Sequence, residues 1–215
     1  MVKVKEKLNG YYNYTVILTY LGMLFGFTGI VYVTEGEHSL AFICLMIAGV
    51  CDMFDGAVAA TRQRDINEKR YGIQIDSLSD LVCFGILPAL ITYFLCGRSD
   101  FAFLSSCLYV LCALIRLAYF NVMEEERQSK EGGCRSVYQG LPVTASALLL
   151  PVFYMVSQLF AYGRAFIMQA ALIIMAVAFV SPFKVKKPYF LEKIAIIIVG
   201  VIEFWILLVC VGLDV

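Results

Sequence analysis

Long apolar runs separated by short polar stretches dominate the pattern along this chain. A helix that crosses the hydrocarbon core of a membrane needs about 20 mostly apolar residues. By this measure we predict seven membrane-spanning helices, within a range of six to eight, at residues 14–34, 38–61, 72–96, 101–122, 142–162, 165–182 and 191–213. The connections are short, apart from a polar loop at Glu124–Tyr138. The pattern therefore predicts an all-α integral membrane protein, a polytopic helical bundle in a single domain over residues 1–215.

The composition agrees with a membrane protein. Hydrophobic residues make up 61% of the 215 residues and charged residues 16%, whereas a soluble domain is usually about 45–50% apolar and about 25% charged. The formal net charge of zero gives no sign of a nucleic-acid partner, and we predict none. Most of the eight cysteines lie in apolar runs, where cysteine acts as a small hydrophobe. We therefore predict neither a disulfide framework nor a zinc site.

The basic residues predict the orientation in the cell membrane. If the N-terminus lies inside, fourteen of the 17 Lys and Arg residues fall on cytoplasmic segments, and only Arg98 and Arg164 fall on the opposite side. Basic residues favour the cytoplasmic side of a membrane. We therefore expect a cytoplasmic N-terminus, with the four aspartates described next at the cytoplasmic boundary.

Four aspartates stand at the ends of the second and third apolar runs. Asp52 and Asp55 are three residues apart, and Asp76 and Asp80 are four apart, so each pair lies on one helix face. A hairpin joins the two runs, which allows the faces to converge. Four close carboxylates repel one another in a low-dielectric setting, and a divalent cation that prefers oxygen ligands, such as Mg²⁺, Mn²⁺ or Ca²⁺, would relieve that repulsion.

Two other interpretations stay open on the residues alone. The acids could be solvated groups that cap helices, or they could belong to a divalent-cation transporter. A transporter favours carboxylates near mid-membrane on broken helices. Here the acids gather at one boundary beside glycines and a basic loop, which favours an anionic substrate.

The signature region 52–80 carries a resemblance. It reads D-x-x-D-G-x-x-A from Asp52 and G-x-x-x-D-x-x-x-D from Gly72, and it resembles the signature of the CDP-alcohol phosphotransferase family. Further stretches over residues 50–190 are similar to the phosphatidylserine synthase branch of that family: D-S-L-S-D-L-V-C-F-G-I-L-P-A, C-A-L-I-R-L-A-Y-F-N-V, Q-G-L-P and S-P-F-K. One departure is Ala60, where the family usually has arginine. We predict that Arg62 or Arg64 supplies the missing cation.

The resemblance implies a fold, a reaction and a set of roles. It implies the CDP-alcohol phosphotransferase fold, and transfer of the phosphatidyl group from CDP-diacylglycerol to the hydroxyl of L-serine, giving phosphatidylserine and CMP. Other acceptors (glycerol phosphate, inositol phosphate or choline) and an archaeal-type lipid donor stay open. We expect membrane lipids as partners and a homodimer.

The roles implied for single residues fall into three groups. Asp52, Asp55, Asp76 and Asp80 would hold Mg²⁺ or Mn²⁺, as two ions, with Asp80 also acting as the catalytic base. Contacts to CDP are expected from Gly56, Ala59, Arg62 and Gly72. Contacts to the acceptor or to phosphate are expected from Arg64, Arg116, Asn121, Gln139 and Lys184.

Overall fold

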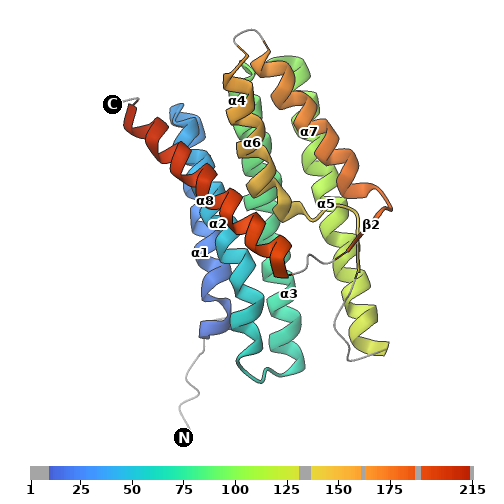
Figure 1. The fold of residues 1–215 in the computed structure, drawn as a ribbon. Coiled ribbons are helices and arrows are strands. Elements are labelled where there is room, and N and C mark those ends of the chain that lie inside the picture. The colour runs from blue at the N-terminus through green and yellow to red at the C-terminus, as the bar shows by residue number, and fades with distance from the viewer. Residues whose placement is uncertain (1–9, 131–136, 161–162, 187–189, 214–215) are drawn as a thin grey trace, which may run out of the picture.

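The computed structural model describes residues 10–130, 137–160, 163–186 and 190–213. The long helices are α1 (Ile17–Glu35), α2 (His38–Ala60), α3 (Ile66–Asp80), α4 (Leu87–Leu95), α5 (Asp100–Lys130), α6 (Ser146–Gln158), α7 (Arg164–Val180) and α8 (Phe190–Leu213). Shorter elements are the 3₁₀ helices η1 (Tyr14–Val16) and η3 (Val143–Ala145), the π-helix η2 (Leu81–Ile86) and the strands β1 (Val137–Gln139) and β2 (Lys184–Lys186). In Figure 1, α5 and α7 run side by side, and α8 crosses the bundle obliquely and packs on α2.

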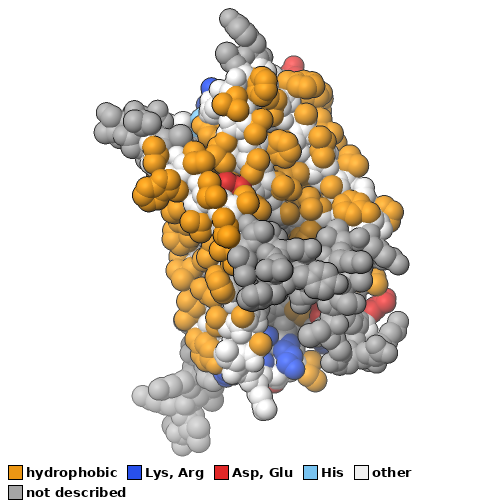
Figure 2. All heavy atoms as spheres, in the orientation of Figure 1, with side chains coloured by type: hydrophobic (Ala, Val, Ile, Leu, Met, Phe, Trp, Pro, Cys, Tyr) orange, Lys and Arg blue, Asp and Glu red, His pale blue; other side chains and the backbone are white. Residues whose placement is uncertain are grey.

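Four helical stretches are long and apolar enough to cross a membrane: Tyr14–Glu35, His38–Ala60, Ile66–Leu95 and Asp100–Glu126. They correspond to the first four predicted spans. The apolar helices Val143–Gln158, Arg164–Val180 and Ile197–Val209 are shorter. Hydrophobic side chains cover the flank of the molecule that Figure 2 shows. Large hydrophobic side chains that are exposed include Phe27, Leu104 and Ile174. The protein is thus a helical integral membrane protein, and the total of seven spans stays a prediction.

A capping box sets the start of α3. The Asp65 carboxylate accepts a hydrogen bond from the Glu68 backbone N–H at 2.7 Å, and the Glu68 side chain accepts from the Asp65 N–H at 3.4 Å. These two bonds satisfy amides at the helix start that have no partner within the helix. The helix therefore begins at Ile66. The predicted span began at residue 72, because the apolar run starts there and the first two turns of the helix before it are polar.

The segment before α1 contacts the α2–α3 hairpin. The Asn13 side-chain amide donates to Glu68 at 3.3 Å, and the hydroxyls of Tyr14 and Thr61 lie 3.2 Å apart. These contacts join the N-terminal segment to both ends of the turn that connects α2 with α3.

Glycines allow α1 to approach its neighbours closely. A Cβ on Gly26 would lie 2.5 Å from the Sγ of Cys83 in η2, and one on Gly22 would lie 3.4 Å from the Cβ of Cys51 in α2. The first distance is too short for any real Cβ contact. The face of α1 that carries these glycines is therefore fixed against α2 and η2.

A π-helical turn directly follows Asp80. Pro88, at the start of α4, has no N–H with which to bond the carbonyl of Phe84 four residues earlier. That carbonyl instead accepts a hydrogen bond from the buried Tyr109 hydroxyl of α5 at 2.8 Å, and the Ser146 hydroxyl of α6 lies at 3.4 Å. Such π-turns occur mostly inside α-helices and frequently at functional sites.

A short β-ribbon joins the start of α6 to the end of α7. β1 and β2 pair antiparallel, with Gln139 opposite Lys184. Gly140 follows with a φ of +70°, and a Cβ there would lie 2.8 Å from the carbonyl oxygen of Phe179, so the position requires glycine. The predicted loop Glu124–Tyr138 is shorter than expected, because α5 continues to Lys130. Its residues 131–136 lie outside the described part of the chain.

Candidate metal centre and active site

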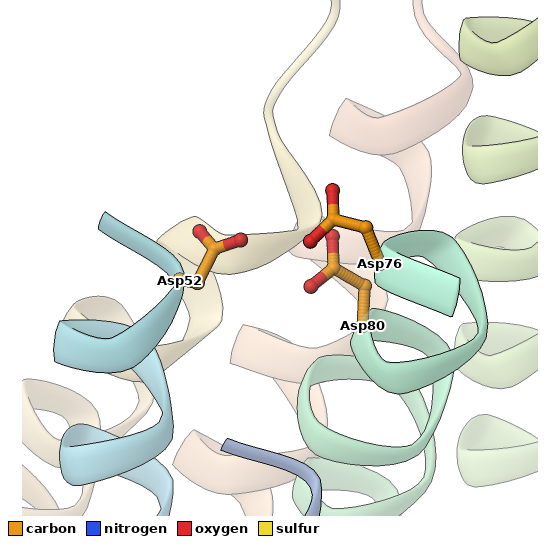
Figure 3. A group of neighbouring side chains, drawn as sticks. All are labelled: Asp52, Asp76 and Asp80. Atoms are coloured by element: carbon orange, nitrogen blue, oxygen red, sulfur yellow. The ribbon is translucent and has the colours of Figure 1, made fainter. Parts of the chain in front are cut away.

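The α2–α3 hairpin brings the four predicted aspartates to one cavity. α2 supplies Asp52 and Asp55, and α3 supplies Asp76 and Asp80. One carboxylate oxygen from each of Asp52, Asp76 and Asp80 lies within 4.8 Å of the other two. Figure 3 shows Asp52 facing the other two across the space between the helices. The helical spacings thus place both pairs as the sequence predicts.

Asp55 lines the same cavity but has a further partner. Its Oδ2 accepts a hydrogen bond from the Thr19 hydroxyl of α1 at 3.2 Å. Thr19 is 8% exposed, and its backbone carbonyl accepts a bond from the Ser79 hydroxyl at 3.4 Å. Sequence reasoning missed Thr19. Its only signal is a hydroxyl within an apolar run, a signal that Thr28 and Thr34 share.

The charge of this cluster is not balanced by the described protein groups. Among the residues that the structure describes, no basic side chain forms an ion pair with any of the four aspartates. Carboxylates this close repel one another when partly withdrawn from water. A divalent cation with hard oxygen preference fits such a donor set, and Mg²⁺ and Mn²⁺ have that preference.

Open space adjoins the aspartates along the last turns of α2. Gly56 is exposed, and a Cβ added there would meet no protein atom within 4 Å. Ala59 is partly exposed and follows almost one turn later. The predicted small residues therefore border a volume that the described protein does not fill.

The two candidate arginines occupy different surroundings. The guanidinium of Arg62 pairs with Glu68 at 3.5 Å, and Glu68 is the residue of the capping box. The Nη1 of Arg64 lies 3.0 Å from where a Cβ on Gly72 would stand. Arg64 therefore lies against Gly72, which the signature places one turn before Asp76, whereas Arg62 pairs with Glu68 at the start of α3.

The predicted acceptor residues lie on α5 and on the β-ribbon. Asn121 accepts a hydrogen bond from the hydroxyl of Ser77 at 2.8 Å, which places it beside α3 next to Asp76. Arg116 is 7% exposed, donates from Nε to the carbonyl of Leu141 at 3.4 Å and stacks on Phe120. Gln139 and Lys184 are paired through the backbone ribbon. The structure thus brings Asn121 to the aspartate helix, and Arg116 to the loop that follows β1.

Comparison with known families decides the assignment. The sequence model of the CDP-alcohol phosphatidyltransferase family matches residues 12–183. The chain belongs to this family. All four aspartates, Arg62, Arg64 and Thr19 lie within the matched range, so the candidate site falls in the part of the chain that the family model covers.

Relatives of this chain include enzymes named for serine. An archaetidylserine synthase from Methanothermobacter thermautotrophicus is 30% identical over 173 residues, which are 79% of this chain and 70% of the relative. A CDP-diacylglycerol–serine O-phosphatidyltransferase from Saccharomyces cerevisiae is 36% identical over 152 residues, 69% of this chain and 51% of the relative. One from Helicobacter pylori is 29% identical over 145 residues, 66% and 57%. The chain thus spans little more than half the length of the last two.

Proposed function

We propose that this protein is a metal-dependent CDP-diacylglycerol–serine O-phosphatidyltransferase of phospholipid biosynthesis. The observation that carries the proposal is the cluster of Asp52, Asp76 and Asp80 on a membrane hairpin, in a chain whose relatives are named for serine transfer. The diacylglycerol tails of the donor would stay in the bilayer. The CDP head would meet the aspartates at the membrane boundary, and serine would enter from water.

The aspartates are proposed to hold the metal. Asp52, Asp76 and Asp80 would bind Mg²⁺ or Mn²⁺, and Asp55 in the same cavity would complete a site for two ions. When bound, such ions supply positive charge that neutralises a diphosphate and its leaving group.

The hairpin residues are proposed to bind the donor. The space beside Gly56 and Ala59 would take part of the CDP group. The guanidinium of Arg64, lying against Gly72, would donate to diphosphate oxygens, and a planar guanidinium suits that geometry. Arg62, paired with Glu68, would instead stabilise the hairpin.

Asp80 is proposed to act as the base. A serine hydroxyl is a poor nucleophile near neutral pH, and a carboxylate positioned beside it can activate it by accepting its proton. Asp80 would take the hydroxyl proton while the serine oxygen forms a bond to the phosphorus that carries diacylglycerol. The bond from that phosphorus to the oxygen bridging the two phosphates breaks, and CMP leaves with the electron pair.

The acceptor is proposed to be L-serine. Its carboxylate calls for a cation, for which Arg116 is the candidate, and its ammonium calls for oxygens, which Asn121 and Gln139 carry. Lys184 would add a cation near the phosphate. An archaeal-type lipid donor is the second candidate, favoured by the relative named archaetidylserine synthase. Serine occurs in the names of all three relatives.

We also propose a cytoplasmic active site and a homodimer. The orientation is supported by the basic residues, most of which fall on segments at the same side of the predicted membrane as the aspartates. The homodimer rests on the family resemblance alone.

Release of CMP tests the proposal. The purified protein should release CMP from CDP-diacylglycerol with L-serine in Mg²⁺ or Mn²⁺, and should lose this activity in a chelator. Glycerol 3-phosphate, inositol phosphate and choline are the matched acceptors, and CDP-archaeol is the matched donor. Faster release with any other acceptor than with L-serine would refute the serine assignment, and full activity in metal-free buffer would refute the role of the aspartates.

A further inference from the structure

Thr19 contacts both of the helices that carry the aspartates. Its hydroxyl donates to Asp55 of α2 at 3.2 Å, and its backbone carbonyl accepts from Ser79 of α3 at 3.4 Å. Ser79 directly precedes Asp80. Thr19 lines the same cavity as the four aspartates and is 8% exposed.

The position of Thr19 is set by α1 rather than by its own hydrogen bond. Gly22 and Gly26 follow at three and seven residues, so the three residues share one helix face. At Gly26 the approach to Cys83 leaves no room for a side chain. Because these contacts fix α1 against α2 and η2, the Thr19 hydroxyl is held at Asp55 independently of what the carboxylate binds.

A hydroxyl has one proton to donate, and here it is aimed at one of the two carboxylate oxygens of Asp55. The bond restrains rotation of that carboxylate and leaves its second oxygen without this partner. Groups that hydrogen-bond a metal ligand orient it and tune its affinity for the metal.

We propose that Thr19 is a positioning residue, which orients Asp55 for divalent-cation binding. This inference rests on the proposed metal-dependent function. Thr19 would act through Asp55 and would not touch the substrates, and it makes α1 a third helix of the metal centre beside α2 and α3.

Thr19→Val is the direct test. Valine has nearly the shape of threonine but no hydroxyl, and the bond from Ser79 to the backbone carbonyl of residue 19 is kept. Mn²⁺ affinity of the metal-free protein, measured by electron paramagnetic resonance or calorimetry without any substrate, should fall roughly 10- to 100-fold. Thr19→Ser restores the hydroxyl and should keep most of the wild-type affinity.

Two controls separate positioning from a general structural effect. Thr28→Val removes an exposed hydroxyl of the same helix, one that donates to the Leu24 carbonyl, and should leave Mn²⁺ affinity unchanged. The double variant Thr19→Val/Asp55→Asn should bind Mn²⁺ no more weakly than Asp55→Asn alone, since effects that pass through one group are not additive.

The outcomes distinguish this inference from the proposed function. Wild-type Mn²⁺ affinity in Thr19→Val, an equal loss in Thr19→Ser, or an additive double variant would each overturn it, even if serine transfer is confirmed. A Thr19-dependent Mn²⁺ site in a protein that releases no CMP with L-serine would support it while the serine assignment fails. A wild-type protein that binds neither Mn²⁺ nor Mg²⁺ would overturn both.

Discussion

Replacing the two arginines of the turn between α2 and α3 separately gives a sharp test of donor binding. Arg62 and Arg64 are two residues apart and carry the same charge, yet Arg62 pairs with Glu68 and Arg64 lies against Gly72. We expect Arg64→Ala to impair use of CDP-diacylglycerol and Arg62→Ala to leave it nearly unchanged. The two variants remove the same side chain and the same charge, at positions two residues apart in one turn.

The magnitudes follow from the two settings. A hydrogen bond to a charged group contributes about 1.5–3 kcal/mol, and each 1.4 kcal/mol is a factor of ten. Loss of the Arg64 guanidinium should therefore lower kcat/KM for the donor by roughly 10- to 150-fold. Arg62 is 41% exposed, and pairs of this kind contribute about 0.2–1 kcal/mol to stability. Glu68 keeps its bonds to Asp65 and Asn13 when Arg62 is removed.

The assay is the initial rate of CMP release at varied CDP-diacylglycerol and saturating L-serine. Arg64→Lys keeps the charge but loses the planar fork, so its kcat/KM should fall between those of the wild type and Arg64→Ala. Thermal unfolding of each variant in detergent shows whether the fold is intact. Equal losses in the two alanine variants, or a change in the serine KM alone for Arg64→Ala, would refute the assignment of the diphosphate contact to Arg64.

Three further predictions concern single residues of the site. Gly56→Ala should raise the unfolding temperature, because alanine in a helix is favoured over glycine by roughly 0.5–1 kcal/mol. It should also raise the KM for CDP-diacylglycerol, since its Cβ would enter space where no protein atom lies within 4 Å and where the CDP group is proposed to bind. An unchanged KM would show that CDP does not lie against Gly56. Asp80→Asn should abolish turnover but largely keep CDP-lipid binding, whereas Asp52→Asn should weaken both; equal loss of binding affinity in the two variants contradicts this division of roles. Arg116→Lys should raise the KM for L-serine far more than that for the donor in steady-state kinetics, because an ammonium cannot replace a bidentate guanidinium, and a larger effect on the donor KM would move Arg116 out of the acceptor site.

The aspartate cluster could be predicted because helical periodicity carries the information. Spacings of three and four residues place each pair on one helix face. The turn between α2 and α3 has only five residues, so the two helices lie next to each other and the two faces can meet. The lengths of the apolar runs located the first four apolar helices. They placed the start of α3 too late, because the first two turns are polar and their helical state depends on the Asp65 and Glu68 capping box.

Other parts of the site depend on contacts that sequence pattern does not record. Thr19, Thr28 and Thr34 look alike along α1, and only the packing of α1 on α2 distinguishes the one that reaches Asp55. Arg62 and Arg64 are equivalent by sequence until Glu68 is seen to pair with the first. The β-ribbon was not predicted, because strands of three residues are too short to show an alternating pattern.

The carbonyl of Phe84 has a consequence for how family members can diverge. Pro88 cannot give this carbonyl the N–H that an α-helix supplies from four residues on, and the Tyr109 hydroxyl bonds it in a fully buried setting. If a descendant lost the tyrosine hydroxyl alone, the carbonyl would keep only the longer bond from Ser146 at 3.4 Å, and stability would fall. If it lost the proline alone, the regained N–H would add a donor without displacing the phenol, because a carbonyl oxygen can accept more than one hydrogen bond. Homologues that lack the tyrosine should therefore also lack the proline, whereas loss of the proline alone should be tolerated.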